Sequence, residues 1–315
     1  MAFRTLTALI LSTVIASLSG CSKGPPTTGD PPPKPDETPA GPFEVKTGPV
    51  TFPELGLGRP IKPGVLFDEV TLQRGGVPMR VWVYRPQKAA GKLPLVLVPP
   101  AGSRLFDGMD LGDGDREEHY PYVKAGFAVV SFQIDGQVPE DGGEPALYQG
   151  ARQFKDAQAG LANAKAALDF ALAKVPNLDA DRVYIAGHSS AATLALLFAE
   201  HEPRIKACVA YAPCTDVESR LAPALGDLNR AIPGFRSFIR SSSPKSHVDR
   251  LKCPTFLFHA QDDQNVPVRE TQDFAAALKK TNPAVTLVLT PRGGHHDSMV
   301  REGMPKAIQW LQKGP

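Results

Sequence analysis

A candidate nucleophile, Ser189, stands in the middle of the stretch Gly187-His188-Ser189-Ser190-Ala191. The apolar residues before this stretch predict a short strand, and the Ala- and Leu-rich residues after it predict a helix. Ser189 would then lie at the tip of a sharp strand-to-helix turn, which is the geometry of a nucleophile elbow. The elbow pattern is Gly-x-Ser-x-Gly, and here alanine takes the last position. The motif predicts a catalytic serine, and the alternative from these five residues alone is a serine at an ordinary helix N-cap.

A serine nucleophile needs a histidine as general base and an acid that orients the histidine. Asp262 and Asp263 follow one predicted strand, and His295 and His296 follow the last one. Because parallel strands bring their carboxyl ends to the same edge of a sheet, these side chains are expected to meet Ser189 there. The chain order of serine, aspartate and histidine is also that of one large group of hydrolases.

The elements that must position these residues alternate between strands and helices. Such alternation predicts an α/β fold with a mostly parallel central sheet and helices on both faces. Residues 216–249 are irregular and form a small insertion before the acid-bearing strand, which we expect to cover part of the pocket and to set substrate size. The predicted strands are residues 67–72 and 79–84, which form a hairpin across Gly75-Gly76, and then 93–98, 127–132, 182–187, 205–211, 254–259 and 285–290; the predicted helices are 120–125, 154–174, 190–198, 270–280 and 304–312.

With these motifs in place, the chain resembles the α/β-hydrolases, in the branch shared by dienelactone hydrolases and the catalytic domain of prolyl oligopeptidase-type peptidases. The resemblance covers roughly residues 65–312. It rests on the elbow, on Asp-x-x-Val-Pro at residues 263–267, on Gly-Gly-His at residues 293–295, and on Ser243-Pro244 before Val248-Asp249-Arg250.

The resemblance implies a role for each matching residue. It assigns Ser189 as nucleophile, Asp263 as acid and His295 as general base, with Asp262 and His296 as the alternatives for the last two. His188, beside the nucleophile, is expected to shape the turn rather than to react.

The oxyanion hole needs two N–H donors. The backbone of Ser190 should give one, and the loop after an early strand should give the other. That loop reads Pro99-Pro100-Ala101-Gly102, and proline has no N–H. Ala101 or Gly102 must therefore supply the second donor.

These residues predict a serine hydrolase that cleaves an ester or a peptide bond through an acyl-enzyme on Ser189. The substrate would be a small-molecule ester or a short peptide. Small esters are favoured, because prolyl oligopeptidase-type peptidases usually place a propeller before the catalytic domain and none fits before Val65. The alternatives are a prolyl oligopeptidase-like peptidase and a non-catalytic binding lipoprotein on the same fold.

No cofactor is indicated by the sequence, and His295-His296-Asp297 lacks the complementary ligands of a metal site. Cys208 and Cys253 are predicted to lie in the core. Cys214 follows a strand end and could pair with Cys208 or line the pocket.

The N-terminal segment reads as a targeting sequence. Residues 1–20 have the pattern of a signal peptide, and Leu18-Ser19-Gly20-Cys21 resembles the bacterial lipobox, which implies that Cys21 carries the lipid. Residues 21–64 are rich in proline and predict a tether, and residues 65–315 predict the hydrolase domain. We therefore expect a protein of the bacterial cell envelope, lipid-anchored to a membrane and facing the extracytoplasmic side.

Charge excludes one class of partner. The net charge of +2 gives no basic field of the kind that binds nucleic acid. The sequence does not bear on the oligomeric state.

Overall fold

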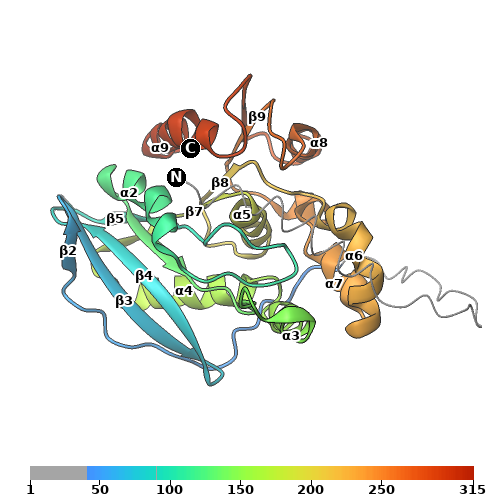
Figure 1. The fold of residues 1–315 in the computed structure, drawn as a ribbon. Coiled ribbons are helices and arrows are strands. Elements are labelled where there is room, and N and C mark those ends of the chain that lie inside the picture. Colours follow the sequence, from blue (N-terminus) through green and yellow to red (C-terminus); the bar gives the residue numbers. More distant parts are fainter. Residues whose placement is uncertain (1–40, 90) are drawn as a thin grey trace, which may run out of the picture.

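The computed structural model describes residues 41–89 and 91–315, which form a ten-stranded sheet flanked by helices (Figure 1). The strand order is β1-β3-β4-β6-β5-β7-β8-β9-β10, and β2 pairs with β3 outside this path. The strands are β1 (Val50–Thr51), β2 (Arg59–Lys62), β3 (Val65–Arg74), β4 (Val77–Pro86), β5 (Leu93–Leu97), β6 (Ala128–Phe132), β7 (Leu178–His188), β8 (Ala207–Tyr211), β9 (Thr255–Ala260) and β10 (Val285–Thr290).

Strand direction confirms the predicted α/β class. From β6 through β5, β7, β8 and β9 to β10, every neighbouring pair is parallel. The hairpin of β3 and β4 adds antiparallel strands at one edge, and its turn lies at Gly75-Gly76, where both φ angles are positive. The predicted hairpin and the predicted buried strands are therefore present.

Helices cover both faces of the sheet. The helical segments are η1 (Asp113–Asp115), α2 (Arg116–Lys124), α3 (Gly143–Asp156), α4 (Leu161–Lys174), α5 (Ser190–His201), α6 (Val217–Ala231), α7 (Phe235–Ser241), η2 (Pro244–Arg250), α8 (Val268–Leu278), η3 (Met299–Gly303) and α9 (Met304–Gln312). Apolar residues of α2 and α9 join one core cluster, and those of α4, α5 and α8 join the other. Along β5 the side chains alternate between the two clusters, as the period of a strand requires. Within the described ranges, none of these helices has the length and apolar character needed to cross a bilayer.

The predicted helix over residues 154–174 is wrong, because two helices, α3 and α4, occupy this region. They are separated at Gln158, Ala159 and Gly160, which have φ angles of 55°, 58° and 87°. Three consecutive residues in the left-handed region cannot continue an α-helix. The apolar stripe runs on through both helices, so its periodicity does not reveal the break.

The predicted domain boundary at Val65 also needs correction. Strands β1 and β2 precede Val65 and pair with β3. The ring centroid of Phe43 lies 6.1 Å from that of Phe238. The apolar side chains before Val65 pack against the core, and these are Phe43, Val45, Val50, Phe52 and Leu55. The proline-rich composition of residues 21–64 predicted a tether, and it did not indicate that these apolar side chains pack against the domain. The predicted signal peptide, Cys21 and the first part of the tether lie outside the described residues.

Candidate active site

Ser189 lies at the predicted strand-to-helix turn, between β7 and α5. Its φ of 57° and ψ of −123° are strained for a residue with a side chain, and strain of this kind is characteristic of functional sites. Its N–H donates to the backbone oxygen of Tyr211 at 2.9 Å, which ties the turn to the end of β8. A Cβ at Gly187 would stand 2.3 Å from the backbone oxygen of Ala191, so the elbow requires glycine there. Ala191 is fully buried within α5 and lacks a positive φ, so this position does not require glycine.

Asp263 is the acid at the centre of the site, and its side chain is fully buried. Its Oδ2 accepts from Nδ1 of His295 at 2.7 Å and from Nε2 of His259 at 3.1 Å. Its Oδ1 accepts from the N–H groups of Asn265 and Val266. Burial alone would raise the pKa of Asp263, but these hydrogen bonds outweigh it and hold the pKa well below its usual range. The carboxylate is therefore ionised.

His295 is bound to this carboxylate through one ring nitrogen only. Because an ionised carboxylate can only accept, Nδ1 of His295 carries the proton and Nε2 has the free lone pair. The Nε2 atom is buried and has no hydrogen-bond partner among the described residues. Burial lowers the pKa of His295 despite the opposing effect of Asp263, so the ring is neutral near pH 7. A buried, neutral imidazole with an available Nε2 can act as a general base.

His296, the alternative base, has a different neighbour. Its Nδ1 lies 3.7 Å from Oδ1 of Asp297, and its side chain is 30% exposed. The geometry therefore joins Asp263 to His295.

Asp262, the alternative acid, holds the loop that precedes His295. Its carboxylate accepts the N–H groups of Gly293 at 3.1 Å and Gly294 at 2.8 Å, and these bonds lower its pKa. The two adjacent aspartates therefore have different roles: Asp262 binds the loop backbone, and Asp263 binds the imidazole of His295.

His188 connects the elbow to the same loop. Its Nε2 lies 2.8 Å from the backbone oxygen of His295, and the two rings are 4.6 Å apart between centroids. On its other side, Nδ1 lies 3.6 Å from Oε1 of Glu118, which is also buried. Burial would raise the pKa of Glu118, but the neighbouring His188 holds it below its usual range. His188 therefore positions the histidine loop.

His259 also belongs to the site, although the sequence motifs assign it no role. It is fully buried at the end of β9, and its Nε2 contacts both Asp263 and the backbone oxygen of Val266. Its Nδ1 lies 2.7 Å from the hydroxyl of Thr271 on α8. The available signal was a histidine near the end of an apolar strand, four residues before the acid.

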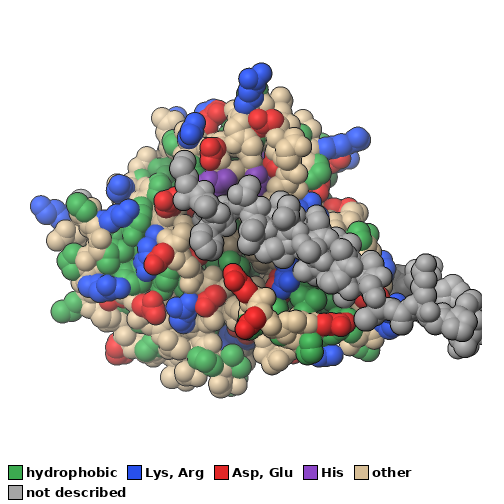
Figure 2. Space-filling view, in the orientation of Figure 1, with side chains coloured by type: hydrophobic (Ala, Val, Ile, Leu, Met, Phe, Trp, Pro, Cys, Tyr) green, Lys and Arg blue, Asp and Glu red, His purple; other side chains and the backbone are tan. Residues whose placement is uncertain are grey.

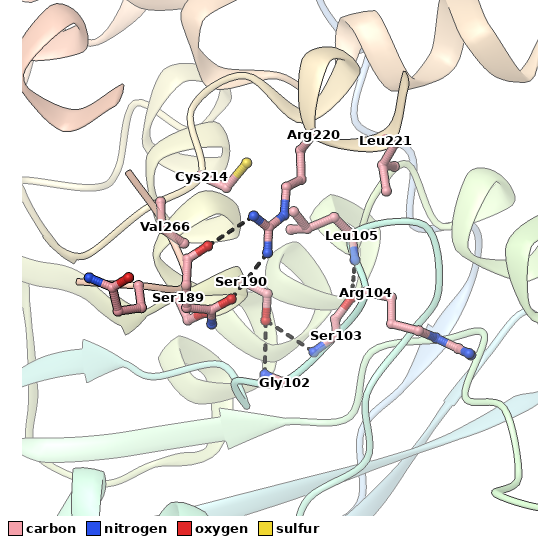
Figure 3. Close-up of a pocket in the computed structure, with 12 residues that line it drawn as sticks. Gly102, Ser103, Arg104, Leu105, Ser189, Ser190, Cys214, Arg220, Leu221 and Val266 are labelled. Carbon is pink, nitrogen blue, oxygen red and sulfur yellow. Dashed lines mark hydrogen bonds between the residues drawn. The ribbon is translucent and has the colours of Figure 1, made fainter. Parts of the chain in front are cut away.

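Ser190 begins α5 and faces the loop after β5 (Figure 3). Its Oγ accepts the N–H of Gly102 at 2.9 Å and the N–H of Ser103 at 3.1 Å. The N–H of Gly102, predicted as a possible oxyanion donor, is therefore bonded to the hydroxyl of Ser190. The backbone N–H of Ser190 lies at the helix N-terminus, where partial positive charge favours an anion.

A cavity of about 220 Å³ opens beside the two serines (Figure 3). Helix α6 contributes Arg220 and Leu221 to its wall, so the insertion borders the pocket as predicted. The guanidinium of Arg220 donates to the backbone oxygen and to Oδ1 of Asn265. The full lining is residues 102–105, Ser189, Ser190, Cys214, Arg220, Leu221 and residues 264–266.

The state of the cysteines decides between the two roles predicted for Cys214. Cys208, Cys214 and Cys253 are all free thiols, so Cys214 does not pair with Cys208 and instead lines the cavity. In the part of the chain that the structure describes, no group of three or more His, Cys, Asp or Glu side chains could hold a metal ion.

Acidic and basic side chains are interspersed on the face shown in Figure 2, and histidine side chains reach the surface between them. Among the described residues visible on this face, charges of one sign form no broad patch.

Comparison with known proteins places this geometry in a family. The model described as the prolyl oligopeptidase family matches residues 115–313, a range that includes Ser189, Asp263 and His295. The human acylamino-acid-releasing enzyme is 24% identical over 282 residues, which are 79% of this chain and 34% of the human protein. The chain thus spans about a third of the length of that relative.

Solved structures share the fold. Acylaminoacyl peptidase from Pyrococcus horikoshii superposes with a TM-score of 0.62 at 16% identity, covering 79% of this chain and 41% of the peptidase chain. Acetyl xylan esterase from Paenibacillus sp. R4 superposes with a TM-score of 0.58 at 17% identity, covering 84% of this chain and 89% of the esterase chain. Both an esterase and a peptidase therefore have the α/β-hydrolase fold seen here.

Proposed function

The chain belongs to the prolyl oligopeptidase family of serine hydrolases, and we propose that it acts by forming an acyl-enzyme on Ser189. The observation that carries this proposal is the free, buried Nε2 of His295 beside the elbow. The ring of His188, the residue before Ser189, lies 4.6 Å from the His295 ring between centroids, which places the base next to the elbow.

Catalysis proceeds in two half-reactions. In the first, Oγ of Ser189 attacks the substrate carbonyl while Nε2 of His295 takes the serine proton. The imidazolium then protonates the leaving group, the bond to it breaks, and the acyl group remains on Ser189. In the second, His295 takes a proton from water, the hydroxide attacks the acyl carbon, and the proton returns to Ser189 as the acid is released.

Asp263 keeps His295 ready for both half-reactions. Its Oδ2 fixes the tautomer in which Nε2 is the basic atom, and its charge stabilises the imidazolium that forms. His259 and the backbone N–H groups of Asn265 and Val266 hold the carboxylate in place.

The tetrahedral intermediate needs N–H donors for its oxyanion. The backbone N–H of Ser190 is the first of them, as the residue after the nucleophile. The loop after β5 borders the same cavity through Gly102 and Ser103, whose N–H groups bind the side-chain hydroxyl of Ser190.

We propose small esters as the favoured substrates. A cavity of about 220 Å³, walled on one side by α6, supports an acyl group of a few atoms. The similarity to an acetyl xylan esterase over 89% of that chain points the same way. The similarity to the human acylamino-acid-releasing enzyme motivates the alternative, cleavage of a blocked aminoacyl bond.

A panel of p-nitrophenyl esters of increasing acyl length, set against N-acetyl-aminoacyl arylamides, separates these substrates. We expect the highest kcat/KM for acetyl or butyryl esters and a decline with longer chains. Faster cleavage of the arylamides would transfer the proposal to the peptidase alternative. Hydrolysis of neither series by folded protein would favour a binding module.

We further propose that Cys21 is acylated and anchors the protein to a membrane of the bacterial envelope. The support is the sequence Leu18-Ser19-Gly20-Cys21 directly after an apolar run. Several acyl chains on one residue are enough for stable anchoring. Cys21→Ala should move the protein from the membrane to the soluble fraction of lysed cells, and unchanged partitioning would count against lipidation.

A further inference from the structure

The hydroxyl of Ser190 has an unusual set of partners. A serine hydroxyl has two lone pairs and one proton. The N–H groups of Gly102 and Ser103 occupy both lone pairs, at 2.9 and 3.1 Å. The O–H proton is thus the only hydrogen-bonding capacity that remains, and it has no acceptor in the described part of the chain.

The direction of this proton follows from the geometry. Both N–H donors approach Oγ from the loop after β5 (Figure 3). The tetrahedral arrangement around the oxygen therefore directs the O–H away from that loop. Ser190 also lines the cavity together with Ser189, so a proton that points into this cavity would face a substrate carbonyl bound at Ser189.

We propose that Ser190 provides two donors to the oxyanion, its backbone N–H and its side-chain hydroxyl. Gly102 and Ser103 then act through this hydroxyl and do not touch the oxyanion themselves. The proposal rests on the function assigned to Ser189 above. The hydroxyl of Ser190 is then the second oxyanion donor. Pro99 and Pro100 in the loop after β5 cannot be this donor, because proline has no N–H.

The two N–H bonds make the hydroxyl a better donor. Each polarises the O–H, because hydrogen bonds in a chain strengthen one another in a medium of low dielectric constant. The carbonyl oxygen of the substrate becomes negatively charged only as the tetrahedral intermediate forms. The bond from Ser190 therefore strengthens in the transition state, which is the condition for lowering the barrier.

The same contacts could have the opposite meaning. If Oγ of Ser190 occupied the oxyanion position itself, it would block the Gly102 and Ser103 donors until it rotated away. Removing the hydroxyl would then raise activity, whereas our proposal requires activity to fall. Whether activity rises or falls when the Ser190 hydroxyl is removed therefore distinguishes a blocking role from a donating role.

The test compares Ser190→Ala with Ser190→Thr in the full chain, using the best p-nitrophenyl ester. Loss of one oxyanion donor lowers kcat by about 10²–10³-fold, so we expect this loss for Ser190→Ala with little change in KM. Ser190→Thr restores the hydroxyl and should recover most of the activity. Activity of Ser190→Ala at or above the wild-type level would overturn the proposal.

A second measurement separates donation from simple anchoring of the loop. A boronic acid forms a tetrahedral adduct with a nucleophilic serine, whereas the carboxylate product binds as a ground-state ligand. We expect Ser190→Ala to weaken the boronate by a factor similar to its loss in kcat and to leave product inhibition unchanged. Equal weakening of both ligands would assign Ser190 a structural role only.

Failure of this inference differs from failure of the proposed function. Activity that survives Ser189→Ala would refute the nucleophile assignment. Activity that requires Ser189 but is unaffected in Ser190→Ala would refute only the role of the hydroxyl.

Discussion

Nε2 of His188 donates to the backbone oxygen of His295 at 2.8 Å, so the residue before the proposed nucleophile holds the loop of the proposed base. This bond ties the elbow that carries Ser189 to the loop that carries His295. Glu118 on α2 stands behind His188 and completes a buried chain of contacts from a surface helix to the active site.

His188→Ala should therefore reduce catalysis without removing any reacting group. A displacement of about 1 Å in a catalytic side chain can cost about 10²-fold in rate, and we expect a loss of kcat of this order. Steady-state kinetics on the preferred ester measures the effect. His188→Gln, which retains an N–H donor, should lose less, and equal losses in the two variants would mean that this hydrogen bond is unimportant.

The two adjacent histidines should differ sharply in their effect on activity. Removing one member of a catalytic triad can cost up to about 10⁶-fold in kcat, and we expect a loss approaching this for His295→Ala. His296→Ala should stay within about tenfold of wild type, because Asp263 binds the ring of His295, whereas Nδ1 of His296 lies 3.7 Å from Oδ1 of Asp297. Similar losses in the two variants would contradict the assignment of His295.

The pH profile should show an acid limb at unusually low pH. Burial lowers the pKa of His295 below its ordinary value of 6.5, and the base works only when neutral. Activity should therefore persist as pH falls through 6.5 and decline only below the lowered pKa of His295. The dependence of kcat/KM on pH reports this ionisation in the free enzyme. A midpoint above 6.5 would show that a different group, or a differently placed histidine, limits the reaction.

Stability should also depend on a histidine outside the site. His119 on α2 is fully buried, neither ring nitrogen has a partner among the described residues, and burial lowers its pKa to about 4. The imidazole of His119 binds a proton more tightly in the unfolded chain than in the folded one. The folded state therefore loses stability as pH falls from about 6.5 toward 4. The pKa difference corresponds to a loss of about 2–3 kcal/mol by pH 4.5.

Urea unfolding of wild type and His119→Phe at pH 7.5 and 4.5 measures the contribution of His119 to the free energy of unfolding. Phenylalanine keeps the apolar contacts with Trp82 and Tyr84 but does not titrate. The free energy of unfolding of wild type relative to the variant should fall by about 2–3 kcal/mol between the two pH values. A constant difference would mean that His119 titrates alike in the folded and unfolded chains.

The sequence predicted the three central side chains because a parallel sheet brings the ends of its strands to one edge. Ser189, Asp263 and His295 each follow such a strand, and the structure brings them to that edge. The choice of Asp263 over Asp262 needed a family motif, because both residues follow the same strand. The structure gives the physical difference, since one carboxylate binds an imidazole and the other binds loop N–H groups.

What the sequence could not reveal depends on contacts between distant residues. Ser190 and Gly102 are 88 positions apart, and their bond depends on one side-chain rotamer. The break at Gln158 and Ala159 depends on backbone angles that these residue types rarely adopt. The ring of Phe43 packs against those of His201 and Phe238, which lie far from it along the chain.

The most direct test of the central claim uses a fluorophosphonate probe, which reacts covalently with an activated serine. Peptide mapping by mass spectrometry of labelled wild-type protein should locate the adduct on Ser189. Folded Ser189→Ala protein should remain unlabelled under the same conditions. Absence of labelling in folded wild-type protein, or labelling that survives in Ser189→Ala, would contradict the assignment of Ser189 as the nucleophile.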